Sequence, residues 1–482
     1  MNLGMLSSEL AVIGLALAVL LIDLWTPRQF RHRLGYLAAA GLLVILIASL
    51  CCASTSAPPA TGFSGMFIQD GLALFFKRIF LATGVMIVLM GVEFRDHIPV
   101  GLGEFFSINL MALAGMMFAA SANDFVMVYV AMEMISVSFY VLVSFQRSRS
   151  NSLEAGVKYL ILSALSSGLL VFGIALIFGI SGGTNFSLVA GEGTRLAQNK
   201  VFCLGALLVL LGLAFKISAI PMQMWAPDVY QGAPTPVTAF LAIGSKAAGF
   251  VLVLRVLFVA APALSLQWGK LLTWAAALTI LYGNLFAIPQ RSLKRLLGYS
   301  SIANSGYLLL GVAALNTAGS VAVLYYLAGY AFTLAVIFIV LCLVARENDD
   351  IAVLAGLNRR SPLLALALTL GIISLAGIPP LAGFFGKLLL FKAVLEQAAV
   401  HRSYLWLALV AIAGVVISYY YYFGVIRAVY WGEEGPEMKP IAVSAPLKLS
   451  VGVCIAAMFY LGLGPDAVLS AAREAVARAL RF

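Results

Sequence analysis

The segment Leu211–Trp225 reads LGLAFKISAIPMQMW, an apolar run with Lys216 inside it and Pro221 five residues later. A charged residue near the centre of a membrane span costs about 2.5–3.5 kcal/mol on insertion scales, so it is rarely accidental. Proline removes a backbone donor and clashes with the preceding helical turn. In a bilayer the carbonyls released in this way need new partners. The segment therefore predicts an interrupted membrane helix with a lysine beside the break.

A second segment has the same ingredients. Ile373–Phe391 reads ISLAGIPPLAGFFGKLLLF, with Lys387 seven residues after Pro380. A pair of interrupted helices in corresponding positions indicates two structural repeats. The two interrupted helices divide residues 104–432 into two proposed halves, 104–260 and 261–432, and each half contains five apolar runs. Because five is odd, the second half enters the membrane from the opposite side. The pattern therefore predicts inverted repeats. The alternative is that the prolines only kink ordinary helices.

The whole chain is apolar, with 62% hydrophobic and 10% charged residues over 482 positions. Soluble domains carry about 25% charged residues, and a membrane helix needs about 20 residues. We predict an all-α polytopic membrane protein of about 14 helices, at 9–25, 33–53, 72–92, 104–121, 124–144, 155–180, 201–221, 234–259, 270–289, 299–315, 320–345, 361–397, 403–431 and 446–465. The predicted division is 1–103 (three helices), 104–260 (first repeat, spans 4–8), 261–432 (second repeat, spans 9–13) and 433–482 (span 14 and tail).

The loops predict the orientation. The net charge is +10, and one set of alternate loops holds 15 basic residues, whereas the other set with the C-terminal tail holds 7. Basic loops stay in the cytoplasm, so this excess needs no nucleic-acid partner. Both termini are therefore predicted to lie on the outer, non-cytoplasmic side of the membrane. The first apolar run has no preceding Lys or Arg, so we interpret it as a retained span and not as a cleaved signal.

Motifs for resident cofactors are missing from the sequence. The five cysteines show no CxxC spacing, and the three histidines stand near the ends of apolar runs. Neither GxxxxGK[ST] nor GxGxxG occurs, so the sequence predicts no nucleotide, metal, haem or iron–sulfur site in this chain.

Charged residues inside the predicted spans are the functional candidates. Glu133 is the one acid well inside a predicted span. Eight basic residues also fall inside predicted spans: Lys77, Arg78, Lys158, Lys216, Lys246, Arg255, Lys387 and Lys392. Four of them are expected to extend their charged ends to the membrane–water interface (snorkelling): Lys77, Arg78, Arg255 and Lys392. Lys158 lies early in its span, where a structural and a functional role are equally plausible. Glu133, Lys216, Lys246 and Lys387 are predicted to be functional because burying them is costly.

Four strings carry a family resemblance: Pro221–Val237 (PMQMWAPDVYQGAPTPV), Val130–Val137 (VAMEMISV), Gln290–Gly311 (QRSLKRLLGYSSIANSGYLLLG) and Ala376–Lys387 (AGIPPLAGFFGK). They resemble subunit N of NADH-quinone oxidoreductase, an antiporter-like membrane-arm subunit of respiratory complex I, over essentially the whole chain. Related antiporter-like subunits tend to have PDAH where this chain has Pro227-Asp228-Val229-Tyr230. One of them also carries a long lateral helix beyond the last span, whereas this chain ends soon after its predicted span 14.

The resemblance implies a proton-translocating subunit driven by quinone reduction elsewhere in the complex. It assigns Glu133, Lys216, Lys246, Lys387 and Lys158 to a proton relay. It places NADH, FMN, iron–sulfur clusters and quinone in partner subunits, which include the other antiporter-like membrane-arm subunits. The implied location is a bacterial inner (plasma) membrane, with many spans in the lipid bilayer and both termini in the periplasm.

The residue types suggest a mechanism. Desolvation lowers the pKa of a buried lysine, and a carboxylate ~8 Å away at an effective dielectric near 20 opposes this by roughly 2 kcal/mol. We therefore expect Glu133 to modulate Lys216, Lys246 to relay, and Lys387 to exchange protons with the far side. Water between them would contact Ser218, Thr235, Thr238, Ser245, Ser300, Ser301, Asn304 and Ser305. Two alternatives remain: a stand-alone sodium or potassium/proton antiporter, and a structural subunit that has lost transport.

Overall fold

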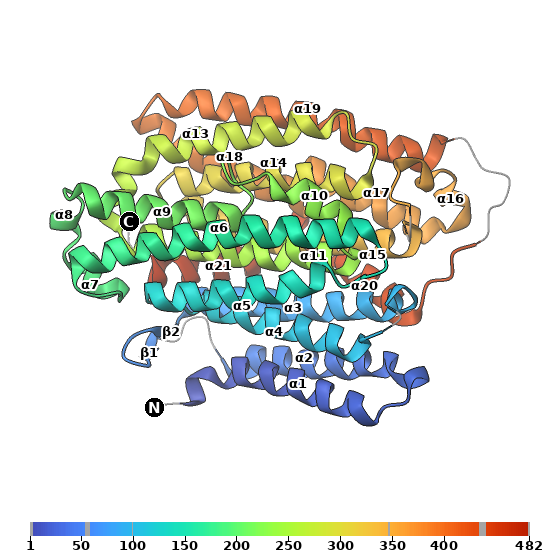
Figure 1. The fold of residues 1–482 in the computed structure, drawn as a ribbon. Helices are drawn as coiled ribbons and strands as arrows, with labels where there is room; N and C mark the ends of the chain where they lie inside the picture. The colour runs from blue at the N-terminus through green and yellow to red at the C-terminus, as the bar shows by residue number, and fades with distance from the viewer. Residues whose placement is uncertain (1–2, 54–57, 99, 346–347, 433–439, 481–482) are drawn as a thin grey trace.

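The computed structural model describes residues 3–53, 58–98, 100–345, 348–432 and 440–480. Almost all of them are helical, and the long helices run side by side in one bundle (Figure 1). Twelve helices in these ranges are long and apolar enough to cross a membrane. The prediction of an all-α polytopic membrane protein is therefore confirmed.

The uninterrupted long helices follow the predicted apolar runs closely. They are α1 (Ser7–Trp25), α2 (His32–Cys52), α3 (Gly71–Glu93), α4 (Leu102–Ala120), α5 (Phe125–Val143), α6 (Ser150–Ser181), α13 (Pro262–Ala287), α14 (Leu293–Ala313), α15 (Thr317–Val344), α19 (Tyr404–Trp431) and α20 (Ala445–Leu463). Short elements join or cap them: η1 (Leu3–Leu6), η2 (Arg28–Phe30), η3 (Arg95–His97), α7 (Phe186–Gly191), α8 (Gly193–Leu196), η6 (Ile351–Leu354) and α16 (Leu357–Arg360).

Two membrane helices are interrupted, as predicted. The first consists of α9 (Lys200–Lys216) and α10 (Trp225–Gly232), and the second of α17 (Pro362–Ala376) and α18 (Ala382–Val400). The Ile220–Pro221 and Pro379–Pro380 peptide bonds inside the two breaks are cis. Two of the fourteen predicted runs fall on these interrupted helices and the other twelve fall on the candidate spans. The grouping into inverted repeats stays a prediction.

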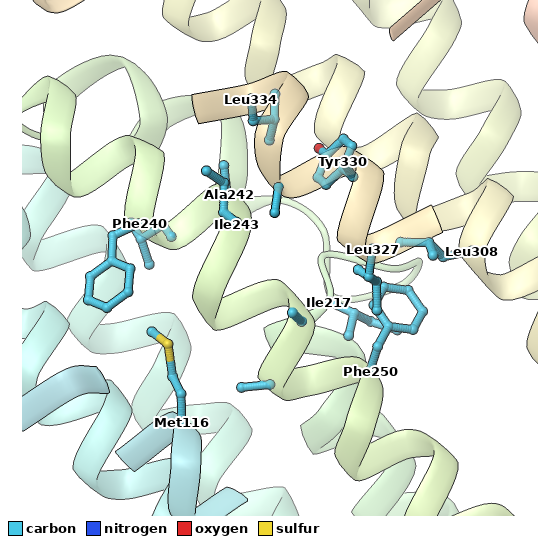
Figure 2. Packing of buried hydrophobic residues seen from close by; sticks show 14 of the residues in the cluster. Met116, Ile217, Phe240, Ala242, Ile243, Phe250, Leu308, Leu327, Tyr330 and Leu334 are labelled. Carbon is cyan, nitrogen blue, oxygen red and sulfur yellow. The ribbon is translucent and has the colours of Figure 1, made fainter. Parts of the chain in front are cut away.

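The helix predicted at 234–259 lies at the centre of the bundle. It consists of α11 (Thr235–Phe240), the π-helical segment η4 (Leu241–Ser245), α12 (Lys246–Arg255) and a second π-helical segment, η5 (Val256–Ala260). Figure 2 shows apolar side chains of this helix, among them Ile243 and Phe250, packed among side chains from other helices. π-Helical turns often mark functional positions, and Lys246 follows the first one directly.

Two of the four basic residues that were expected to snorkel are buried in the bundle, where each is paired with an acid. Arg255 is buried and forms an ion pair of 2.8 Å with Asp70, which precedes α3. Lys77 is buried and lies 2.7 Å from Glu9 of α1. A buried ion needs a partner of opposite charge, and in both cases the partner comes from a segment distant in the sequence.

The other two basic residues with predicted snorkelling lie nearer the surface. Arg78 is partly buried and donates hydrogen bonds of 2.7 and 2.6 Å to the Ser49 and Ala53 carbonyls at the end of α2. The Lys392 side chain is 69% exposed. Each charge also has polar partners, because Lys392 Nζ lies 3.9 Å from Glu396 of the same helix.

Both ends of the described chain lie at the same end of the helical bundle (Figure 1). The C-terminal segment, predicted only as a tail, forms α21 (Asp466–Ala479), whose apolar side packs on α3 and α15. A short antiparallel hairpin of β1 (Ala60–Gly62) and β2 (Phe67–Gln69) pairs Ala60 with Gln69.

Candidate functional site

Three lysines are buried in the interior of the bundle. Lys216, Lys246 and Lys387 are only 1%, 1% and 5% exposed. Each stands beside an irregularity: Lys216 is the last residue of α9, Lys246 follows a π-helical segment, and Lys387 lies early in α18 after the second break. Irregular backbone at membrane depth is tolerated where it lines a polar interior, so these positions form a plausible ion pathway.

Lys216 connects the first break to α5 and α6. Its Nζ donates hydrogen bonds to Ser136 Oγ at 2.9 Å and to Tyr159 OH at 3.3 Å. Side chains also occupy the carbonyls released at the break: Trp225 Nε1 donates to Phe215 O at 2.8 Å, and Ser305 Oγ donates to Ile217 O. The interruption is therefore stabilised by specific partners, as burial of polar backbone requires.

Glu133 lies near this cluster but forms no ion pair with Lys216. It is on α5, three residues before Ser136, and it is partly exposed. Its carboxylate accepts a hydrogen bond from Ser167 Oγ of α6. The predicted electrostatic link to Lys216 thus remains a prediction, with Ser136 of the same helix as the group that touches the lysine.

Glu133→Gln is expected to reduce proton pumping several-fold, and Glu133→Asp less. Glutamine keeps the shape and can accept the Ser167 hydrogen bond, but it loses the charge that favours a protonated Lys216. Pumping by the reconstituted complex, followed with a pH-sensitive dye, measures the effect. Ser167→Ala is the control that removes the hydrogen bond and keeps the charge. Full activity of the glutamine variant would remove the electrostatic argument.

Lys246 is held at the centre by α14. Its Nζ donates to Ser301 O at 2.5 Å and to Ser301 Oγ. The same Oγ lies 3.1 Å from Tyr230 OH of α10 and 3.5 Å from Tyr330 OH of α15. One serine hydroxyl therefore connects the lysine to two tyrosines from opposite parts of the chain.

Lys387 reaches back across the second break. Its Nζ donates to Leu375 O at 2.7 Å and Ala376 O at 3.3 Å, the last carbonyls of α17. A cation is favoured there because the carbonyl end of a helix is negative. Lys216 precedes its break, whereas Lys387 follows its break, as the positions of the prolines in the sequence indicate.

Glycines make room for this lysine. Gly377 ends α17 with a φ of +84°, and a Cβ there would lie 2.9 Å from Lys387 Cδ. A Cβ on Gly383 would lie 1.8 Å from Ser374 O. Only glycine permits both the left-handed conformation and the close approach, which explains these residues of the AGIPPLAGFFGK string.

A chain of polar side chains leads from Lys246 toward the second half. Asn304 Nδ2 donates to Ser300 O at 2.9 Å, and Tyr326 OH donates to Asn304 Oδ1 at 2.5 Å. Ser300 Oγ lies 2.6 Å from Tyr422 OH. The Tyr326 ring stacks on that of Tyr330, whose OH contacts Ser301 Oγ, so the predicted Ser300, Ser301 and Asn304 belong to one buried cluster.

A second branch of the network ends against Lys387. Tyr421 OH donates to Asn284 Oδ1 at 2.9 Å, and Asn284 Nδ2 lies 3.5 Å from Tyr307 OH. The Tyr307 ring centre is 4.8 Å from Lys387 Nζ. Sequence reasoning missed Asn284 and the tyrosines. The signal was present, because Tyr326 and Tyr330 are spaced as neighbours on one helical face and Tyr419–Tyr422 is an unbroken run.

The other predicted polar residues have different surroundings. Thr238 Oγ1 donates to backbone carbonyls, including Tyr230 O at 3.1 Å, and Thr235 begins α11. The hydroxyls of Ser218 and Ser245 are buried, and neither has a hydrogen-bond partner among the described residues. Both adjoin the lysines, Ser218 two residues after Lys216 and Ser245 one residue before Lys246.

Lys158 lies apart from the buried lysines. Its side chain is 43% exposed and forms ion pairs with Asp228 at 2.9 Å and Glu154 at 2.7 Å. Asp228 also pairs with Arg295 of α14 at 2.6 Å. These four side chains line a polar cavity of about 160 Å³. The link to the buried site is indirect, through the adjacent Tyr159, which contacts Lys216.

Comparison with known proteins identifies the family to which this chain belongs. Residues 122–418 match the family described as NADH:quinone oxidoreductase/Mrp antiporter, TM. The fold and the buried lysines thus define an antiporter-like membrane subunit. The chain is 38% identical to NADH-quinone oxidoreductase subunit N of Trichlorobacter lovleyi over 480 residues, covering 98% of this chain and 97% of that protein. It belongs to the subunit N family of NADH-quinone oxidoreductase.

Solved structures agree with this assignment. A chain of respiratory complex I from Thermus thermophilus, solved with bound aureothin, shares 32% identity and a TM-score of 0.81, covering 97% of this chain and 100% of that one. A chain of the Mrp complex from Dietzia has a TM-score of 0.88 at 20% identity, covering 99% and 98%. The second likeness concerns the fold alone.

Proposed function

We propose that this chain is a proton-translocating membrane-arm subunit of NADH-quinone oxidoreductase, with Glu133, Lys216, Lys246 and Lys387 as its relay. The observation that carries the proposal is that all three lysines are buried inside the bundle. Among the described residues, each ammonium is held by hydroxyl or carbonyl oxygens and not by a carboxylate. Lysines without a fixed counter-ion lose and regain a proton more readily than lysines in an ion pair.

The relay needs energy from outside the chain. Moving one proton against about 150 mV takes roughly 3.5 kcal/mol. The family resemblance assigns NADH, FMN, iron–sulfur clusters and quinone to partner subunits, so the energy would arrive through the protein. Glu133 is the natural receiving point, because it is partly exposed on α5 and hydrogen-bonded to α6. Another membrane-arm subunit, for example a second antiporter-like subunit, would cover the side of the bundle on which Glu133 is partly exposed.

The same proposal includes the location and the internal symmetry. The chain would cross a bacterial inner membrane with the basic loops in the cytoplasm and both termini in the periplasm. Residues 104–260 and 261–432 would form the inverted repeats, each with one interrupted helix. Lys158 would act at the edge of the relay, where it pairs with Asp228.

A cation/proton antiporter is the second candidate function, favoured by the fold of the Mrp complex chain. A site for sodium or potassium needs oxygen ligands, usually carboxylates that are not already neutralised. Among the described residues, the buried acids Glu9, Asp70 and Asp23 already face Lys77, Arg255 and Arg31. The fourth buried acid, Asp124, accepts hydrogen bonds from Val126 N and Thr184 Oγ1 at the start of α5. The distribution of charge therefore supports protons over metal cations.

Lys246→Met tests the proposed function, because methionine keeps the length and loses the titratable group. Proton pumping by the assembled complex in proteoliposomes is expected to fall at least tenfold. Lys448→Met, an exposed lysine at the start of α20, is the matched control and should pump normally. Wild-type pumping by the Lys246 variant would overturn the proposal. Pumping that requires sodium or potassium would support the antiporter reading.

A further inference from the structure

Lys294 is a buried lysine that the relay described above does not use. The sequence places it among the basic residues of a loop, but in the structure it is the second residue of α14 and only 7% exposed. Its Nζ donates to Ala233 O at 2.7 Å. Ala233 follows the last residue of α10, so the ammonium lies at the end of the first interrupted helix.

A column of polar groups extends from Lys294 to Lys246. Thr238 Oγ1 also contacts Ala233 O, at 3.5 Å, and donates to Tyr230 O at 3.1 Å. One turn along α10, Tyr230 OH lies 3.1 Å from Ser301 Oγ, which accepts from Lys246. The column therefore has a titratable amine at each end, and between them lie two backbone carbonyls and the hydroxyls of Thr238, Tyr230 and Ser301.

Helix geometry aligns the two ends. Lys294, Gly298 and Ser301 are separated by four and three residues, which places them on one face of α14. Seven residues correspond to a rise of about 10 Å. Gly298 keeps α10 against this face, because a Cβ there would lie 2.9 Å from Pro227 Cα.

An opening to the surface lies beside Lys294. The cavity of about 160 Å³ is lined by Asp228, Gln231, Gly232 and Arg295, among others. Gly232 adjoins Ala233 in the chain and Arg295 adjoins Lys294, so each partner of the Lys294–Ala233 hydrogen bond is one residue away in the chain from a residue that lines the cavity. The side chains of Asp228 and Arg295 are about one-third exposed, which gives water access to the cavity.

We propose that Lys294 is the entry residue of the relay, taking protons from the polar cavity and passing them to Lys246 by way of Tyr230 and Ser301. In each cycle the neutral amine of Lys294 accepts one proton from the bulk phase through cavity water. The Lys294 ammonium then releases one proton toward Lys246, which has already passed its own proton onward, and Lys294 is neutral again. The inference rests on the proposed function, because it needs Lys246 to carry protons.

A purely structural role for Lys294 is the competing explanation. A cation at the end of α10 stabilises the helix by donating to its last carbonyls. The charged and titratable groups that act on Lys294 are Asp349, Arg149 and Cys342. The variants below leave these groups and the cavity residues unchanged.

Two substitutions separate the roles. Lys294→Gln keeps a donor for Ala233 O but cannot carry a proton, and Lys294→His introduces a side chain whose pKa in free peptides is about 6.5, well below the ~10.4 of lysine. If Lys294 is the entry residue, the assembled glutamine variant should pump at least tenfold less than wild type. The histidine variant should pump, with the alkaline fall in its pH profile moved to lower pH, because histidine loses its proton at lower pH.

The controls make the outcome decisive. Lys448→Met should match wild type, and native gels show whether each variant complex assembles. Wild-type pumping in the glutamine variant, or an unshifted pH profile in an active histidine variant, would overturn the entry role. If Lys246→Met also pumps normally, the proposed function itself fails. If only the Lys246 variant is defective, the relay stands and the inference about Lys294 is wrong.

Discussion

Lys216→Ala is expected to abolish proton pumping while the complex still assembles. The side chain removed is almost fully buried, and its ammonium is held by Ser136 Oγ and Tyr159 OH from two other helices. No carboxylate neutralises it among the described residues, so a proton can leave without stranding a bare acid. Without the amine, the cluster of Ser136 and Tyr159 has no lysine to take up and release a proton.

The alanine variant also leaves a cavity, which alone destabilises a packed core. Lys216→Met separates the two effects, because methionine fills most of the space without a titratable group. Both variants should lose pumping, and methionine should assemble at least as well as alanine. Protons moved per electron, followed with a pH-sensitive dye in proteoliposomes, is the quantity to measure. Wild-type pumping in either assembled variant would refute the central position given to Lys216.

Lys387→Met is expected to depress quinone reduction as well as pumping. Lys387 lies at the far end of the polar network, beside the second break and against the Tyr307 ring. If the two halves act in series, a block at this end stops the whole path. In a coupled enzyme that block would also slow the redox reaction of the partner subunits. Donor:quinone turnover in membranes, with assembly checked on native gels, measures it.

Lys387→Arg distinguishes proton exchange from a fixed positive charge. Arginine can still donate to the Leu375 and Ala376 carbonyls, but it does not release its proton in proteins. We therefore expect turnover nearly as low as in the methionine variant. Lys392→Arg on the same helix is the matched control, because its side chain is 69% exposed. An arginine variant at the wild-type rate would mean that Lys387 only stabilises the end of α17.

The positions of helices and breaks could be predicted because the signals are local. An apolar run of sufficient length folds as a helix in a bilayer wherever it stands, since its backbone groups bond within the segment. A proline disrupts the turn that precedes it. Hence the interruptions at Pro221 and Pro379–Pro380 follow from their immediate neighbours.

The partners of charged residues could not be predicted, because each contact joins segments distant in the chain. Arg255 and Lys77 were expected at an interface, yet they meet Asp70 and Glu9 across helices. Lys158 was grouped with the relay, and the structure places it in a half-exposed ion-pair cluster with Asp228. Composition and spacing indicate that burying a charge costs free energy. They do not show which group will pair with that charge.

The sequence by itself determined a membrane bundle with two interrupted helices, and it predicted a function for four charges that are costly to bury, Glu133, Lys216, Lys246 and Lys387. Hydrophobicity, the effect of proline on a helix and the free-energy cost of burying an ion are properties of each segment by itself. They can therefore be inferred from the sequence without knowing the fold. Only the tertiary structure decided that Ser301 joins Lys246 to Tyr230, that Lys387 reaches back across its break, and that Lys294 is buried. Hydrogen bonds act over about 3 Å, and only packing brings distant segments that close.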